Sequence, residues 1–97
     1  MSLAEAQRID NLNKALFSAV LSGHVVDVEK FINDGADIHY KGNRAIKYAA
    51  SHDRHEIVKL LLDHGADQNK LTHRYNTAAD IARAHGHNEM ENFIRNY

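Results

Sequence analysis

The chain repeats itself, and no other feature of its sequence limits the fold as strongly. The tripeptide Gly-Ala-Asp occurs at 35–37 and again at 65–67, an offset of 30 residues. The same offset pairs Ala15 with Ala45, Leu16 with Ile46, Ala19 with Ala49, Val28 with Val58, Phe31 with Leu61 and Ile32 with Leu62. A second offset, of 33 residues, pairs Ala45 with Ala78, Ala49 with Ala82, His52 with His85, Glu56 with Glu89, Ile57 with Met90, Leu60 with Phe93 and Leu61 with Ile94. Tandem copies predict a stack of units, because one short unit cannot bury its apolar residues without a neighbour.

Each copy has the pattern of two short helices joined by a turn. In the middle copy, Ile46, Ala49 and Ala50 give a first helix one apolar face. The polar residues 51–54 predict a turn, and the apolar run 56–63 predicts a second helix. No segment alternates apolar and polar residues for long enough to predict a strand.

Residues that favour helix ends bound these segments. Gly65 follows the apolar run at the position where a left-handed residue ends a helix, and Gly35 takes the same place one copy earlier. At the N-terminus, Ser2 with Glu5 forms the pattern of a capping box, which predicts one long first helix over about residues 3–22. Thr77 with Asp80 is a variant of that pattern and predicts the start of a helix in the last copy.

These motifs resemble a known family. Residues 45–69 are similar to an ankyrin repeat, residues 18–37 resemble the same unit, and residues 77–94 resemble a closing ankyrin repeat. The motifs that carry the resemblance are Ala49-Ala50, the run from Glu56 to Leu62, and Gly65-Ala66-Asp67 with Asn69. The resemblance covers about residues 12–97 and implies an all-α ankyrin-repeat solenoid of three helix pairs with an extended N-terminal helix.

We therefore expect a single ankyrin-repeat domain over residues 1–97. Its units span about 12–43, 44–76 and 77–97, and the helix extension spans 3–11. The chain also departs from the family's pattern, because it has no proline in the family's Thr-Pro-Leu-His opening, and Asp53-Arg54 stands where Gly-His is usual. Six residues, 38–43, follow the first Gly-Ala-Asp before the next helix, against nine, 68–76, after the second. The shorter loop argues against a full hairpin between the first two units.

Composition excludes several classes of function. The chain has 97 residues, 12 Lys and Arg against 13 Asp and Glu, and no cysteine. It therefore has no disulfide framework, no thiolate metal site and no cysteine nucleophile, which agrees with a cytoplasmic location. No apolar run approaches the roughly 20 residues that a membrane helix needs. The sequence contains no Gly-rich phosphate loop, no nucleophile elbow and no HExxH motif, so we expect no enzyme and no cofactor.

The eight histidines raise the question of a metal site. His52 and His85 occupy equivalent positions, and with His55 they could bind zinc, but the set contains no carboxylate. We therefore expect no metal and favour a surface row of histidines that contacts a partner. His24 and His87 follow a glycine at the family's Gly-His turn, where we expect the ring to bond the backbone.

The placement of charge suggests a binding face. Residues 38–48 hold Lys41, Arg44 and Lys47 and no acid, whereas acids concentrate on the second helices and their ends. The ankyrin resemblance implies that the loops and first helices share one concave face, which would then be basic and carry tyrosines. The predicted partner-binding residues are Tyr40, Lys41, Arg44, Lys47, His52, Lys70, His73, Arg74, Tyr75 and His85.

A basic face with tyrosines is suited to an acidic protein surface. We expect non-catalytic protein binding by a lone module, a small inhibitor or modulator, for example a phage or bacterial factor that blocks a host defence protein. Nucleic acid is the alternative partner, since basic side chains neutralise phosphates and aromatic side chains stack on unpaired nucleobases. A homodimer through the last helix is a third hypothesis, because Phe93, Ile94 and Tyr97 end the array with little chain to cover them.

Overall fold

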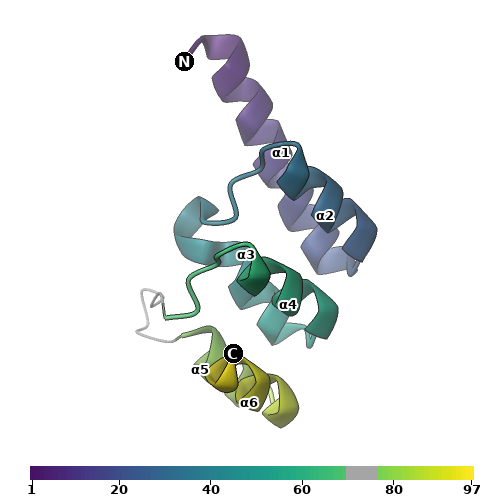
Figure 1. Ribbon diagram of the computed structural model, residues 1–97, viewed down its shortest axis with the longest axis vertical. Helices are drawn as coiled ribbons and strands as arrows, with labels where there is room; N and C mark the ends of the chain where they lie inside the picture. The colour runs from purple at the N-terminus through teal and green to yellow at the C-terminus, as the bar shows by residue number, and fades with distance from the viewer. Residues whose placement is uncertain (70–76) are drawn as a thin grey trace.

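The computed structural model describes residues 1–69 and 77–97, and the described residues form helices and no strand. The helices are α1 (Leu3–Ser22), α2 (Val25–Asn33), α3 (Tyr40–Ser51), α4 (His55–Asp63), α5 (Ala78–Ala84) and α6 (Asn88–Asn96). They form three consecutive pairs that stack in chain order, with the first turns of α1 projecting beyond the stack (Figure 1). The all-α solenoid of helix pairs and the long first helix are confirmed.

The helices lie in two rows. We call α1, α3 and α5 the inner row and α2, α4 and α6 the outer row. Within the inner row, α3 packs against both α1 and α5, and α2 packs against α4 in the outer row. The segments that follow α2 and α4 leave the stack on the same side (Figure 1), as expected for units that repeat in one orientation.

The core runs through all three pairs. Small residues, among them Ala49 and Ala50, are fully buried on α3 and let the inner helices approach closely. Leu61 of α4 has no exposed surface. The other large side chains that are fully buried are Leu16, Val20, Val28, Ile46, Ile57, Val58, Met90 and Ile94. Each such side chain stabilises the fold by roughly 1.5–3 kcal/mol relative to exposure.

The predicted helix ends form with one exception. Gly35 and Gly65 have φ of 111° and 90°, and the following N–H groups of Ala36 and Ala66 reach back to helix carbonyls, as in a Schellman motif. The Ser2 hydroxyl accepts a hydrogen bond from the Glu5 N–H. The return bond from the Glu5 carboxylate does not form in the described residues, because this first turn is exposed and the carboxylate stays in water.

Two buried asparagines fix the loops that lead from one helix pair to the next. The Asn13 carboxamide oxygen accepts from the backbone N–H of Asp37 at 2.6 Å, and the Asn43 oxygen accepts from the N–H of Asp67 at 3.1 Å. The two asparagines are 6% and 4% exposed. Each one therefore satisfies a backbone donor of the loop that follows its own pair.

A second set of contacts, which ties neighbouring helix pairs together, lies at the C-terminal ends of α1 and α3. Arg54 donates from a guanidinium nitrogen to the Leu21 carbonyl at 3.1 Å, and His87 donates from Nε2 to the Ser51 carbonyl at 3.1 Å. Each side chain thus binds the last turn of the inner helix in the preceding pair, where carbonyls lack helical partners and attract positive charge. The backbone bond predicted for His87 is confirmed.

Gly23 tests the first of these ties. Its φ is +76°, and a Cβ placed on it would lie 2.8 Å from a terminal nitrogen of Arg54. We expect Gly23→Ala to lower the free energy of unfolding by about 2 kcal/mol, because left-handed backbone strain adds to displacement of Arg54. Gly86 has φ of +77° and no neighbour within 4 Å, so Gly86→Ala should cost only about 1 kcal/mol. Urea unfolding of both variants measures the difference, and equal losses would show that Arg54 does not matter there.

Candidate protein-binding face

Helices α1 and α3 bring four side chains together on the inner row. The rings of Phe17 and Tyr48 meet edge to face with centroids 4.9 Å apart, and the Arg44 guanidinium lies 5.4 Å from the centre of the Phe17 ring. His52 stacks near Tyr48 at 6.3 Å. Arg44, Tyr48 and His52 follow one another at intervals of four residues, which places them on one helix face. We call Phe17, Arg44, Tyr48 and His52 the aromatic cluster.

The aromatic cluster combines exposed apolar surface with open hydrogen-bonding groups. Tyr48 is 41% exposed, although it is a large aromatic residue. Arg44 is half-buried and makes no hydrogen bond or ion pair within 1–69 and 77–97. The His52 Nδ1 donates to the Tyr48 carbonyl at 2.9 Å. The other ring nitrogen, Nε2, has no partner in the described chain. Such aromatic and arginine groups are the side chains that anchor protein interfaces.

A left-handed turn interrupts α3 just before Arg44. Lys41, Gly42 and Asn43 have φ of 51°, 69° and 63°, a conformation that non-glycine residues adopt only at a cost of about 1–2 kcal/mol each. The turn takes the place that a longer loop would fill, and it agrees with the expectation of no full hairpin there. In this turn the Lys41 ammonium lies over the Tyr40 ring, 5.5 Å from its centroid. Lys47 donates a hydrogen bond to the Gly42 carbonyl at 2.7 Å.

The predicted site residues divide into three groups. Tyr40, Lys41, Arg44, Lys47 and His52 all lie on α3 or at its ends. His85 ends α5, where its Nδ1 donates to the Ile81 carbonyl and its ring stacks on His87. The remaining four, Lys70, His73, Arg74 and Tyr75, fall outside the described residues.

Sequence reasoning missed Phe17 as a member of this site. Its equivalents one and two units later are Lys47 and Asp80, so the repeat gives no warning of an aromatic residue there. The sequence signal that could have indicated Phe17 was its position on the predicted first helix, three residues before the buried Val20 and next to the buried Leu16.

The face also carries acid that the sequence analysis did not place there. Asp10 pairs with Lys14 at 3.0 Å and accepts a hydrogen bond from the Tyr40 hydroxyl at 3.4 Å. The hydrogen bond from Lys14 is the main reason that the pKa of Asp10 lies below its usual value. Lys14 is therefore neutralised, and the positive charge of this face is concentrated on α3, including its left-handed turn.

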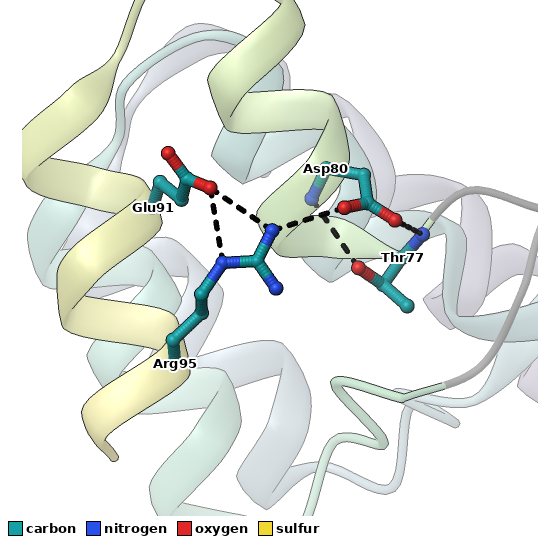
Figure 2. Close-up of polar contacts among 4 residues, drawn as sticks. All are labelled: Thr77, Asp80, Glu91 and Arg95. Atoms are coloured by element: carbon teal, nitrogen blue, oxygen red, sulfur yellow. Dashed lines mark hydrogen bonds and ion pairs between the residues drawn. The ribbon is translucent and has the colours of Figure 1, made fainter.

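The far end of the stack is closed by a polar network (Figure 2). Arg95 pairs with Glu91 at 2.9 Å and with Asp80 at 3.0 Å, and Asp80 forms a complete capping box with Thr77, which confirms the predicted cap. Glu91 and Arg95 stand one repeat after Val58 and Leu62, which are buried. Charge thus replaces apolar residues on the wall that faces away from the stack.

This wall corrects one premise of the homodimer hypothesis. Ile94 was expected to lie uncovered, but it is only 1% exposed because α6 turns it toward the core. Phe93 is half-buried and packs on the core, and the Tyr97 hydroxyl donates to the Asp63 carboxylate. Of the three residues, only Tyr97 remains largely exposed.

The Asp80 carboxylate makes stability depend on pH. Hydrogen bonds from the Thr77 N–H and then from Arg95 hold its pKa below the usual value. A lowered folded pKa adds stability that is complete above the unfolded pKa of about 3.9 and is lost as the pH falls through the folded value. We expect Asp80→Asn to cost about 0.5–1 kcal/mol near neutral pH and to match the parent protein in strong acid. Thermal unfolding across that range tests this, with Glu89→Gln as the exposed control; a difference that persists in acid would contradict it.

Three of the described histidines bond the last turn of the helix that they follow. His52, His64 and His85 each donate Nδ1 to the carbonyl four residues earlier. His24 instead lies 3.8 Å from Asp27 and makes no backbone bond through its ring in the described chain, because no preceding unit offers it a carbonyl. Within the described ranges, no three histidine, aspartate or glutamate side chains gather closely enough to bind a metal ion.

Comparison with known proteins identifies this architecture. The family profile described as ankyrin repeats in three copies matches residues 2–72. The chain belongs to the ankyrin-repeat family. Ankyrin repeats generally mediate protein–protein interaction and generally carry no enzymatic activity. Among the described helices, none has the length and apolar character needed to cross a membrane.

Several curated ankyrin proteins are similar to the chain. It is 38% identical over 88 residues to the ankyrin repeat and KH domain-containing protein mask-1 of Caenorhabditis elegans, which covers 88% of this chain and 3% of that protein. A putative ankyrin repeat protein of fowlpox virus is 41% identical over 62% of this chain and 8% of its own length. A putative ankyrin repeat protein of Acanthamoeba polyphaga mimivirus is 36% identical over 55% of this chain and 20% of its own length. The chain thus spans a small part of each of these relatives.

Proposed function

We propose that this ankyrin chain binds a partner protein through the face formed by α1 and α3, including the left-handed turn inside α3. The observation that carries the proposal is the aromatic cluster, in which exposed aromatic surface surrounds a half-buried arginine that has no counter-charge in the described chain. Such a surface loses little conformational entropy on binding, because ring contacts already hold Arg44 and Tyr48 in place.

The proposed partner presents an acidic surface. Lys41 and Arg44 are the cations of this face without an ion pair in the part of the chain that the structure describes, and complementary charge raises the rate and selectivity of association. In this proposal the chain acts as a cytoplasmic inhibitor or modulator, because covering a partner's surface needs no reacting groups. Nucleic acid is the weaker candidate, since Lys14 is neutralised by Asp10 and the two cations Lys41 and Arg44 offer a phosphate backbone few contacts.

Charge reversal tests the proposed face. We expect Lys41→Glu with Arg44→Glu to reduce capture of the partner from a lysate of the source cells by about tenfold or more, because like charges replace complementary ones. The measurement is affinity capture by the tagged chain, quantified by mass spectrometry, with far-UV circular dichroism as a check of folding. The matched control reverses Lys30 and Arg83, which are exposed on α2 and α5 and change the net charge equally.

Two outcomes would contradict the proposal. Undiminished capture by the Lys41 and Arg44 variant would show that the partner binds another surface of the chain. An equal loss in the Lys30 and Arg83 control would reduce the effect to net charge. Titration with single-stranded DNA at low salt addresses the nucleic-acid alternative, and binding there with no protein captured would replace the proposed partner class.

A further inference from the structure

Arg44 is held in position while its hydrogen-bond donors stay open. Its guanidinium lies over the Phe17 ring at 5.4 Å, and the side chain is half-buried. No carboxylate or carbonyl in the described chain accepts from it. A planar guanidinium with five donors matches a carboxylate through two parallel hydrogen bonds, which a lysine ammonium cannot reproduce. Arg44 therefore has the geometry of a carboxylate receptor with its orientation already fixed.

The equivalent positions in the other two units are occupied differently. Lys14, one unit earlier, is neutralised by Asp10 at 3.0 Å. Thr77, one unit later, has no charge and caps α5. The open cation therefore belongs to the junction between the first and second helix pairs and is not a general consequence of the repeat.

A shallow hollow lies beside the guanidinium. Phe17, Ile38, Tyr40 and Arg44 are among the residues that line it. Asp37 also lines it, but a carboxylate oxygen of Asp37 accepts from the His39 N–H at 2.9 Å and forms no ion pair with Arg44 in the described residues. The hollow has room for about one water molecule, about 10 Å³, so it leaves the guanidinium open on this side but is too small to seat a side chain.

We infer that Arg44 binds the carboxylate of an aspartate or glutamate in the partner. This inference rests on the proposed function, because it assigns the chemistry of one contact on the proposed face. Charge complementarity selects the occupant: the cation lacks a counter-charge, and its fork shape matches a carboxylate. The nearby Asp10 pair limits the positive charge available to a polyanion such as nucleic acid.

A peptide selection tests the inference without knowledge of the natural partner. A displayed library of random dodecapeptides is selected on the full chain, and individual synthetic peptides are then measured by fluorescence anisotropy. We expect the selected peptides to share an acidic residue. Arg44→Lys keeps the charge and loses the fork, so affinity should fall about tenfold, and Arg44→Gln should lower it further.

Matched variants and a second probe separate the outcomes. Arg83 is exposed on α5 without a hydrogen bond or ion pair in the described chain, so Arg83→Lys and Arg83→Gln should leave affinity unchanged. Selected peptides that bind the Arg44→Lys variant as tightly as the parent chain would overturn the carboxylate contact. Tighter binding of a phosphoserine peptide than of its glutamate counterpart would also overturn it, in favour of a phosphate.

The failure of this inference is distinguishable from failure of the proposed function. Peptide binding that is insensitive to Arg44 but lost in Tyr48→Ala would keep the proposed face and reject the carboxylate contact. Peptide binding that is insensitive to both changes, or a selection that enriches nothing on the folded chain, would count against both. Circular dichroism of each variant excludes unfolding as the cause of any loss.

Discussion

Replacing Leu61 by alanine is expected to lower the free energy of unfolding by about 2–5 kcal/mol. Leu61 has no exposed surface and belongs to the core cluster that runs through the three helix pairs. The substitution removes buried carbon atoms and leaves a cavity that neighbouring helices can fill only in part. Because a domain of this size has a total stability of about 5–15 kcal/mol, this single change should bring the chain close to unfolding.

The neighbouring Leu60 supplies the control for this prediction. It lies on the same helix but is only half-buried, so Leu60→Ala should cost about 1–2 kcal/mol. Urea unfolding followed by far-UV circular dichroism measures both variants. Equal losses for the two leucines would show that the stack does not bury α4 as described.

Replacing Asn43 by alanine is expected to cost about 2–4 kcal/mol, from two separate causes. The Asn43 carboxamide oxygen is the acceptor for the Asp67 N–H at 3.1 Å and lies 2.9 Å from the His39 Nδ1, so its removal leaves a backbone donor unsatisfied. The residue also has φ of 63°, which alanine adopts less readily than asparagine. Thermal unfolding should therefore show a Tm lower by about 10 °C or more.

Two further substitutions at Asn43 separate these causes. Asn43→Gly tolerates the backbone conformation and removes the acceptor, so about 1–3 kcal/mol should still be lost. Asn43→Asp keeps the acceptor and the tolerance for positive φ but buries a carboxylate, so most of the stability should return in acid, where that carboxyl is neutral, and less of it near neutral pH. Asn92→Ala, an exposed change on α6, should stay within about 0.5 kcal/mol. An Asn43→Asp variant that stays as unstable as Asn43→Ala when both are measured in acid would refute the hydrogen-bond explanation.

The elements of the fold were readable from local pattern. The predicted helix over 3–22 agrees with α1 from Leu3 to Ser22, and the predicted turn at 51–54 agrees with the gap between α3 and α4. These agreements arise because helix ends and apolar faces depend on residues within one or two turns of each other. The glycine ends of α2 and α4 belong to the same class.

The candidate site was only partly readable. The positions of the cations on α3 were predicted, but their pairing was not. The sequence does not show that Lys14 is neutralised by Asp10 while Arg44 is left open. It also gave no reason to join Phe17 to Tyr48, which are 31 positions apart and meet only because α1 packs on α3.

The sequence by itself determined the repeat, the helices and the order in which the pairs follow one another, because each of these depends on short-range periodicity and capping. The tertiary structure decided which polar groups are buried and joined. Asn13 and Asn43 reach loop N–H groups 24 residues away, and Arg54 and His87 reach carbonyls 33 and 36 residues away. Those contacts depend on how far each helix pair is shifted and turned against the next, and that geometry is set by the summed packing of the whole stack.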